Sequence, residues 1–254
     1  MEPLLLTSHH LRALGVVHAF TTRTGGASTG PWAWLNLGRG SSDDPRTVAA
    51  NRARVLEALG AGGWAHVETA QVHGDVVAVV GRADDGQVIP GADGLATAEP
   101  GVVLAVHAAD CVPVLLADPR ARVVAAVHAG WRGIAAGVAV QAVLVLADRF
   151  GSRPEDLRAA LGPAILACHY EVDEPVVARL RRWPWWEDVL TPSRPGHWRM
   201  DLHGAVRRQL VDAGVPPAQV ETLAWCTYEH PDLFYSYRRD GTTGRQAALI
   251  ALPP

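Results

Sequence analysis

The sequence predicts one α/β domain that spans residues 1–254. Predicted strands and helices alternate along the chain, and we find no internal repeat, low-complexity stretch or linker that would mark a second domain. The middle of the chain is its most apolar part and holds three short β-branched runs, at Val102–His107, Val112–Leu116 and Val123–Val127. Such runs are typical of strands that are buried on both faces.

The first third of the chain predicts a strand and then a helix. The strand covers Val16–Thr22 and leads into a turn-rich loop at Arg23–Pro31. Apolar residues at helical spacing predict a helix over Pro45–Leu59, because proline is favoured in the first turn and Asp43 or Asp44 can cap it.

Glycines at Gly60–Gly63 are expected to end this helix. Two further apolar runs, Val67–Val72 and Val76–Val80, predict strands. The segment between them, His73-Gly74-Asp75, has the composition of a turn.

After the three central strands, a glycine-rich turn at His128–Gly133 leads into an alanine- and valine-rich segment that predicts one helix over Ile134–Phe150. The final third predicts helices near Glu174–Arg182 and His203–Ala213. A last strand is expected at Gln246–Leu252.

Composition narrows the classes of function. A net charge of −3 does not suit a nucleic-acid binder that depends on neutralising phosphates, and no apolar stretch reaches the roughly 20 residues of a membrane span. All 23 basic residues are arginine, which excludes a P-loop lysine and Schiff-base chemistry. Three cysteines without a CxxC pair, and no recognisable signal peptide, favour a cytoplasmic protein.

Three side chains at predicted strand ends form a candidate metal site: His73, Cys111 and His128. Two imidazoles and one thiolate suit zinc, and three protein ligands leave a fourth position for water or substrate. Asp110 is expected to orient one of these ligands from behind. The same atoms also allow a cysteine hydrolase, in which Cys111 is the nucleophile and His73 or His128 the base.

Two other cysteine–histidine neighbours in the sequence are weaker candidates for a catalytic site. Cys168 and His169 are adjacent, and on an extended segment their side chains would point in opposite directions, so we do not expect them to form a catalytic pair. Cys226 lies near His230, but a buried thiol with a packing role is the ordinary case.

An ordered set of motifs along nearly the whole chain points to a known family. The motifs are Phe20–Gly26 (FTTRTGG), Leu35–Gly38 (LNLG), Gln71–Val77 (QVHGDVV), Ala92–Thr97 (ADGLAT), Ala108–Val114 (AADCVPV), Ala126–Gly133 (AVHAGWRG), Leu161–Ile165 (LGPAI) and Phe234–Arg245 (FYSYRRDGTTGR). In these motifs the chain resembles the YfiH/laccase-domain family of purine nucleoside phosphorylases, once labelled polyphenol oxidases.

The resemblance implies a layered α/β sandwich, with a mixed β-sheet core flanked by helices. It implies a metal site at the same His73, Cys111 and His128, phosphorolysis of adenosine, inosine, guanosine and methylthioadenosine, and deamination of adenosine. The expected partners are therefore purine nucleosides and phosphate, with monomer and homodimer both open. The family commonly has threonine before the ADC sequence, where this chain has Ala109, and His107 is an additional imidazole without an assigned role.

Phosphorolysis needs a pocket that binds an anion, and arginine can hold phosphate in bidentate fashion. Arg132 precedes a predicted helix, where free backbone N–H groups attract anions. The other candidates for binding substrate or phosphate are Arg23, Asn36, Arg238, Arg239 and, less strongly, Arg245.

Two alternatives to a zinc phosphorylase stay open besides the cysteine hydrolase. A copper-dependent polyphenol oxidase fits poorly, because the chain has no His-x-His pair and its only methionines are Met1 and Met200. A non-catalytic protein that keeps the fold would release no purine base in the presence of phosphate.

Overall fold

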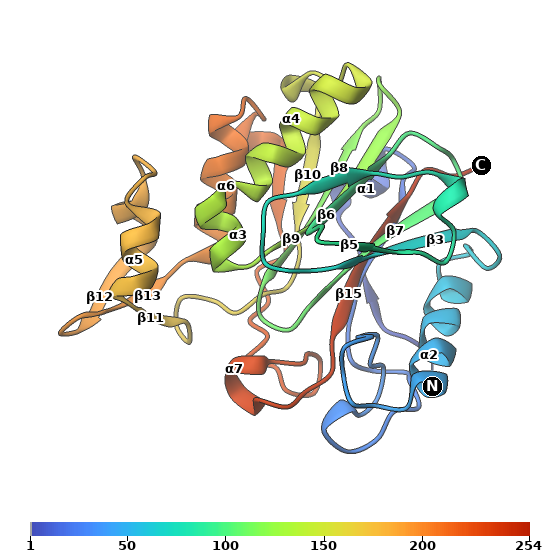
Figure 1. Cartoon of the computed structure of the whole chain (residues 1–254), viewed down its shortest axis with the longest axis horizontal. Helices are drawn as coiled ribbons and strands as arrows, with labels where there is room; N and C mark the ends of the chain where they lie inside the picture. The colour runs from blue at the N-terminus through green and yellow to red at the C-terminus, as the bar shows by residue number, and fades with distance from the viewer. Residues whose placement is uncertain (1) are drawn as a thin grey trace.

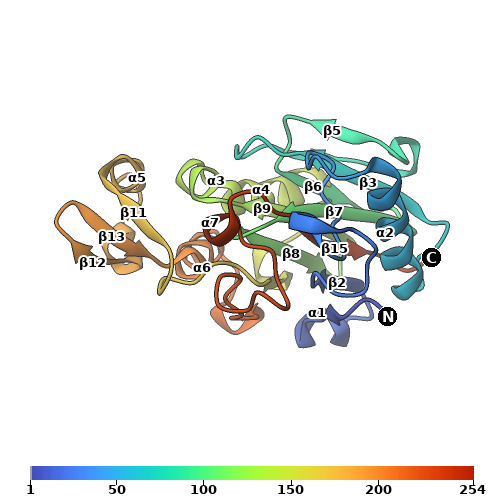
Figure 2. The ribbon, with the colours of Figure 1, turned by 90° about the horizontal axis from the view of Figure 1, so that it is seen from below.

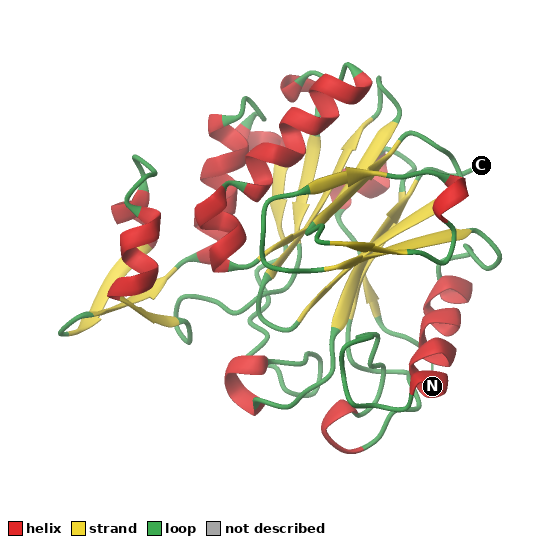
Figure 3. Cartoon of the chain, viewed as in Figure 1, coloured by secondary structure: helices red, strands yellow, loops and turns green. Residues whose placement is uncertain are grey.

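Two mixed six-stranded sheets pack face to face, and helices cover their outer faces (Figures 1 and 3). The structure is a computed structural model and describes residues 2–254. This arrangement confirms the α/β sandwich, with two mixed sheets where the sequence analysis expected one.

From β3 to β8 the strands alternate between the two sheets along the chain. The first sheet has the order β1 (Leu5–Leu6), β2 (Val17–Thr21), β15 (Gln246–Ala251), β7 (Val102–Ala108), β3 (Ala65–Ala70) and β5 (Val88–Pro90). The second has the order β14 (Val220–Thr222), β10 (Arg158–Leu161), β8 (Val112–Asp118), β9 (Val123–Ala129), β6 (Gly94–Thr97) and β4 (Val77–Val79). A small third sheet contains β11 (Glu171–Asp173), β13 (His197–Met200) and β12 (Leu190–Arg194).

The helices cover the sandwich unevenly. They are α1 (His9–Ala13), α2 (Pro45–Ala58), α3 (Trp131–Ala136), α4 (Val138–Phe150), α5 (Glu174–Leu180), α6 (Leu202–Asp212) and α7 (Tyr237–Asp240). In Figure 3, α3, α4 and α6 lie on one side of the sheets and α2 on the other. The third sheet and α5 stand apart from the main body, as Figures 1 and 2 both show. None of the helices in residues 2–254 has the length and hydropathy needed to cross a bilayer.

The central strands are apolar on both faces because both faces are covered. Leu104 and Val106 of β7 pack between the sheets against Leu115 of β8. The alternate residues Val103 and Ala105 face outward into the cluster that includes α2. Each fully buried valine or leucine side chain contributes roughly 1.5–3 kcal/mol to the stability of the fold. The interpretation of these runs as strands buried on both faces is confirmed.

The prediction of one continuous helix after the central strands is wrong. The segment expected as Ile134–Phe150 is two helices that meet at Gly137, where φ is +105°. That backbone conformation favours glycine, and a Cβ there would lie 3.3 Å from the Trp183 ring. The first helix also begins earlier than expected, at Trp131, directly after the motif that contains His128.

The other helix starts follow the local sequence more closely. Asp44 caps α2, and its carboxylate accepts hydrogen bonds from the backbone N–H groups of Arg46 (3.3 Å) and Thr47 (3.0 Å). The cap and the proline in the first turn place α2 as predicted.

Candidate metal centre

Three chain segments meet at one end of the sandwich. The segment from β3 to β4 crosses from the first sheet to the second and carries His73. The segment from β7 to β8 makes the same crossing and carries Cys111. In the β8–β9 ladder Val112 pairs with Ala129, so Cys111 lies beside the end of β9 that carries His128. The topology therefore brings together residues that are far apart in sequence.

The three side chains form a compact donor cluster. One ligand atom from each of His73, Cys111 and His128 lies within 4.8 Å of the others, and the two imidazole rings meet edge to face with centroids 4.8 Å apart. Zinc–ligand bonds of about 2.0–2.3 Å in a tetrahedron place ligand atoms roughly 3.3–3.8 Å apart. The cluster needs only small side-chain adjustments to reach that spacing, and its exposed His73 side faces solvent. The donors therefore fit a zinc ion with one open position.

Asp93 organises the cluster from inside the protein. Its buried carboxylate lies 2.8 Å from His128 Nδ1 and accepts the backbone N–H groups of Val72 (3.0 Å), His73 (3.0 Å) and Gly74 (2.7 Å). Because a carboxylate can only accept, His128 donates from Nδ1 and keeps Nε2 free for the cluster. The same carboxylate holds the His73 backbone, whose φ of +60° is uncommon for a residue other than glycine.

Gly130 provides the space that the ligands occupy. A Cβ at this position would lie 2.7 Å from His73 Nδ1 and 2.9 Å from Cys111 Sγ. Only glycine lets the start of α3 approach the cluster this closely. The first glycine of the AVHAGWRG motif, Gly130, is therefore part of the site.

The electrostatics favour a thiolate at the centre. Burial alone would raise the pKa of Cys111, but the charge of His128 and hydrogen bonds from His128 and His73 lower this pKa to about 6. Burial opposes the charged form of His128, yet Cys111 and Asp93 raise its pKa to about 9. A thiolate is both the ligand form of cysteine and its nucleophilic form, so the geometry alone does not decide between a metal site and a cysteine nucleophile.

Asp110 does not contact the ligand histidines, contrary to expectation. Its carboxylate accepts the Thr227 hydroxyl (2.6 Å) and the backbone N–H of Arg238 (2.7 Å), so it tethers the start of α7 beside the cluster. The orienting carboxylate that the sequence analysis missed is Asp93 of the ADGLAT motif. Its signal was an acidic residue at the start of a buried apolar strand.

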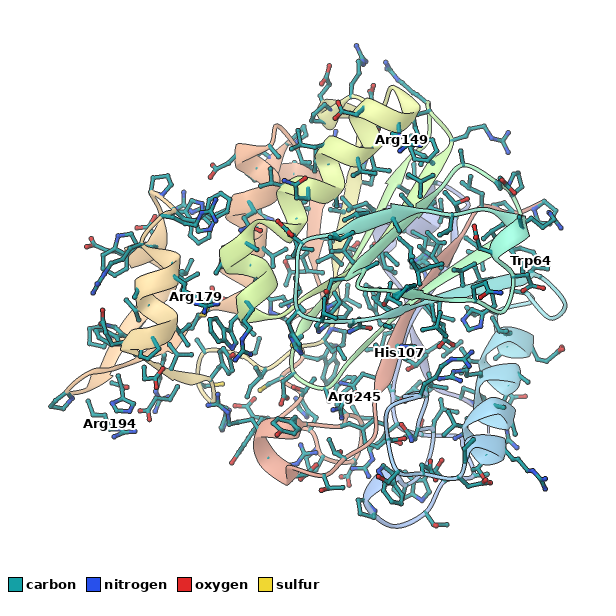
Figure 4. The ribbon with its side chains drawn as sticks, in the orientation of Figure 1. Trp64, His107, Arg149, Arg179, Arg194 and Arg245 are labelled. Carbon is teal, nitrogen blue, oxygen red and sulfur yellow. The ribbon has the colours of Figure 1, made fainter. Side chains whose placement is uncertain are left out.

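Arg132 and Arg238 are exposed, and each stacks on an aromatic ring. The Arg132 guanidinium stacks on the Trp131 ring at 4.4 Å, and Arg238 stacks on Tyr170 at 4.7 Å. Trp131, Tyr170 and Arg238 line a hollow of about 290 Å³ between α7 and the third sheet. Figure 4 shows Arg179 on α5 directed toward α3, where it approaches the Trp131 ring.

Tyr170 connects this hollow with the thiolate. Burial and the Cys111 charge raise the pKa of the Tyr170 phenol, and Arg238 and Arg132 only partly oppose them. The phenol therefore keeps its proton at neutral pH and can donate a hydrogen bond beside the cluster.

The other predicted binding residues are engaged by the protein itself. Arg23 donates to the carbonyl oxygens of Ala33 and Pro231. Arg239 donates to the carbonyls of Thr227, Tyr228 and Phe234. Asn36 is fully buried and bridges backbone N–H groups of Gly38 and Arg245 with the side chains of Ser41 and Asp43. These contacts stabilise the surrounding loops, and a role of the three residues in binding stays a prediction.

Arg245 was the weakest of the predicted candidates for binding substrate or phosphate, yet it lies near Cys111 and Asp110. Figure 4 shows it at the start of β15, on the side of α7. Burial lowers the pKa of its guanidinium, and the nearby Cys111 and Asp110 oppose that effect. Arg245 and Tyr237 line a second hollow of about 290 Å³. A larger hollow of about 880 Å³, between the N-terminal segment and α2, contains none of the cluster residues.

His107 belongs to a different part of the molecule. It faces a buried ion network under α2, beside Glu68, Arg52 and His66. Figure 4 places it at the centre of the molecule, above Arg245. The additional imidazole of the AADC region is thus a structural group outside the donor cluster.

Comparison with known proteins agrees with this architecture. A family model described as multi-copper polyphenol oxidoreductase laccase matches residues 17–253. A protein of Deinococcus radiodurans named purine nucleoside phosphorylase is 47% identical over 244 residues, which cover 94% of this chain and 90% of that protein. Another, purine nucleoside phosphorylase YlmD of Geobacillus stearothermophilus, is 41% identical over 93% of this chain and 90% of its own length.

Solved structures give the same result. The crystal structure of YlmD from Geobacillus stearothermophilus has a TM-score of 0.95 and 39% identity, covering 100% of this chain and 97% of that one. The crystal structure of the Bacillus licheniformis hypothetical protein YfiH has a TM-score of 0.94 and 36% identity, covering 98% and 96%. The chain therefore belongs to the YfiH/laccase-domain family.

Proposed function

We propose that this protein is a metal-dependent purine nucleoside phosphorylase. Its substrates are adenosine, inosine, guanosine and methylthioadenosine, and it also deaminates adenosine. The proposal rests on the cluster of His73, Cys111 and His128, found in a chain that is 47% identical to a protein named purine nucleoside phosphorylase.

The donor set favours zinc over copper. A blue-copper centre also uses two histidines and one cysteine but adds a weak axial ligand, usually methionine. Met200 lies fully buried in the helix-side core, packed with the residues around α6 rather than with the cluster, and Met1 lies outside the described residues. The sequence also has none of the His-x-His pairs of a multicopper centre.

In phosphorolysis a phosphate oxygen attacks the anomeric carbon of the ribose, and the electrons of the breaking C–N bond pass to the purine. Arg238 and Arg132 would hold the phosphate on the exposed side of the cluster. The neutral phenol of Tyr170 would donate a hydrogen bond to an oxygen or nitrogen that gains charge. A zinc ion, when bound, supplies a Lewis acid beside these groups.

The first test is Cys111→Ala, assayed with inosine plus phosphate by the release of hypoxanthine. We expect a loss of at least about 100-fold in turnover, because removing one of three ligands also removes the metal. His9→Ala, at an exposed histidine of α1, is the matched control and keeps full activity. Undiminished turnover in Cys111→Ala would overturn the assignment.

Adenosine assayed with and without phosphate separates the two reactions. Adenine release requires phosphate, whereas inosine formation does not. Zinc analysis of wild type and Cys111→Ala tests the cysteine hydrolase: an equivalent of zinc that active wild type holds and Cys111→Ala lacks disfavours a free Cys111 nucleophile.

The arginines need a separate test. Arg238→Met should raise the KM for phosphate by about 10-fold or more while the KM for the nucleoside changes less, since a charged hydrogen bond contributes about 1.5–3 kcal/mol. Arg149→Met, at the far end of α4 in Figure 4, is the control that leaves both constants unchanged. Equal phosphate constants in all three proteins would exclude Arg238 as a phosphate ligand.

A further inference from the structure

A second group of metal-ligand side chains lies outside the cluster described above. Cys168 and His169 belong to the loop between β10 and β11, and Cys226 and Glu229 to the segment between β14 and α7. These two segments are already joined, because Ala164 and Cys226 form a β-bridge. Cys226 is buried, while Cys168 and Glu229 are exposed, so the group is open to solvent on one side.

The local backbone brings Cys168 and His169 together. The sequence analysis expected an extended segment with opposed side chains, but residues 167–169 form a turn. His169 Nδ1 therefore lies 3.1 Å from Cys168 Sγ. His230, the histidine nearest to Cys226 in the sequence, instead packs edge to face against Trp225 with ring centroids 5.0 Å apart.

Four of the six separations among the donor atoms lie between 3.1 and 3.8 Å, and the other two are no more than 4.8 Å. His169 Nδ1 lies 3.8 Å from Cys226 Sγ and 3.4 Å from Glu229 Oε1. Cys168 Sγ lies 3.3 Å from the same Glu229 oxygen. A zinc ion with tetrahedral ligands requires separations of roughly 3.3–3.8 Å. Three of the four separations lie in that range and the fourth, 3.1 Å, is slightly shorter, so the group is close to the geometry of a four-ligand site.

Hydrogen bonds alone do not account well for this arrangement. His169 Nδ1 faces two sulfurs and a carboxylate oxygen, but an imidazole nitrogen can donate only one hydrogen. The ring is also fixed in orientation, because it stacks on Tyr228 at 4.4 Å with an interplanar angle of 15°. A single cation can contact all of these donors at once.

We infer that Cys168, His169, Cys226 and Glu229 form a second zinc site, structural in kind and separate from the cluster of His73, Cys111 and His128. Two thiolates, one imidazole and one carboxylate are ligands that zinc accepts, and four protein ligands leave no position for substrate. The site would fasten the β10–β11 loop to the segment that precedes α7.

The segment between β14 and α7 also contacts Asp110, the neighbour of the first cluster's Cys111. Thr227, next to Cys226, donates its hydroxyl to Asp110, the neighbour of Cys111. The carbonyl of Thr227 accepts a hydrogen bond from Arg239 of α7 (2.7 Å). Zinc at the second site would therefore hold in place the segment on which Asp110 and α7 depend.

The test is a zinc titration of the full chain, stripped of metal and kept reduced with a phosphine throughout. Wild type should bind two equivalents. His169→Ala and Cys168→Ser should each bind one, Cys111→Ala should bind one, and the double variant Cys111→Ala/His169→Ala should bind none. His230→Ala is the matched control, since His230 packs on Trp225 instead of the group, and it should bind two.

Cobalt in place of zinc identifies which site remains. The intensity of the thiolate-to-cobalt absorption follows the number of cysteine ligands, so Cys111→Ala should give about twice the absorption per bound ion of His169→Ala. One equivalent in wild type that persists in both His169→Ala and Cys168→Ser, or two equivalents in both of these variants, would overturn the inference. Neither result depends on phosphorylase activity, so failure of the second site and failure of the proposed function are distinguishable.

Discussion

Asp93 Oδ1 and His128 Nδ1 lie 2.8 Å apart, and this buried hydrogen bond joins the two halves of the donor cluster. The carboxylate that orients His128 also accepts three backbone N–H groups around His73. Burial would raise the pKa of Asp93, but the bonds from His128 and from the backbone outweigh it and keep the pKa below its usual range. One ionised side chain thus sets the position of two proposed ligands.

We therefore expect Asp93→Asn to weaken zinc binding at the first site by about 10–100-fold, the usual effect of removing a hydrogen-bond partner behind a metal ligand. An amide can accept at only one atom, so some of the four contacts must be lost. Competition with a chromophoric chelator measures the affinity. Asp75→Asn makes the same charge change in the loop that carries His73 and should leave the affinity unchanged. Equal losses in both variants would contradict a specific role for Asp93.

Gly130→Ala tests the close approach of α3 to the ligands. The added Cβ would meet His73 Nδ1 at 2.7 Å and Cys111 Sγ at 2.9 Å, so at least one ligand must move. Overpacking of this kind costs about 1–3 kcal/mol, and we expect zinc affinity at the first site to fall by roughly 5–150-fold. Gly40→Ala is the control, because no atom lies within 4 Å of its Cβ position. Unchanged zinc affinity in Gly130→Ala would show that the ligands are not confined by α3.

Some features of the site and the fold can be predicted from the sequence, and others cannot. That His73, Cys111 and His128 lie together was predictable, because each lies in or near an end of a strand whose apolar run is clear in the sequence. Asp93 was missed because an acidic residue before a buried apolar strand is only a weak local signal, and its contacts with His128 and the His73 backbone form across the sandwich. The break at Gly137 was missed because one glycine in an alanine- and valine-rich run does not reveal that its backbone adopts a positive φ.

The third sheet and the arginines show a second limit. β11 to β13 are short and largely exposed, so they lack the apolar pattern that marks a buried strand. Arg23 and Arg238 are both arginines in motifs of the family. Arg23 donates to the carbonyls of Ala33 and Pro231, whereas Arg238 donates to the carbonyl of Glu171 and also borders a hollow. Such differences depend on loop conformations that residue type alone does not specify.

Alkylation of the metal-free protein checks the charge state of the cluster. The Cys111 thiol has a pKa of about 6, whereas burial, Glu229 and Cys226 raise the pKa of Cys168 to about 11. The thiolate is the reactive form, so at pH 7 Cys111 should react with iodoacetamide faster than the more exposed Cys168. Peptide mass mapping over pH 5–9 should show Cys111 labelling rising through about pH 6. Added zinc should protect Cys111, and faster labelling of Cys168 at pH 7 would contradict the assignment.

Glu68 should carry a large share of stability under α2. Its carboxylate is 1% exposed and lies 2.6 Å from Arg39 Nε and 2.9 Å from Arg52 Nε. Removing one partner of a buried ion pair leaves an unpaired charge and costs about 3–5 kcal/mol. We expect Glu68→Gln to lower the free energy of unfolding by that amount in denaturant titrations. The control Glu174→Gln breaks an exposed pair with Arg181 and should cost less than about 1 kcal/mol; similar losses in the two variants would contradict the prediction.

His107, beside the same network, should make the protein sensitive to acid. Burial lowers its pKa to about 4, although Glu68 opposes this. Between the folded pKa of about 4 and the ordinary histidine pKa of 6.5, the unfolded chain binds the proton and the folded protein does not, so stability must fall as the pH decreases through this window. His107→Leu removes the titrating group, and the free energy of unfolding should then depend less on pH between 4 and 6.5. The comparison is made by denaturant titration at each pH, with His9→Ala as the exposed control. If the free energy of unfolding depends on pH equally in wild type and in His107→Leu, another group is responsible. The acid sensitivity expected from His107 arises because the unfolded chain takes up a proton that the buried imidazole does not, and the leucine variant lacks this group.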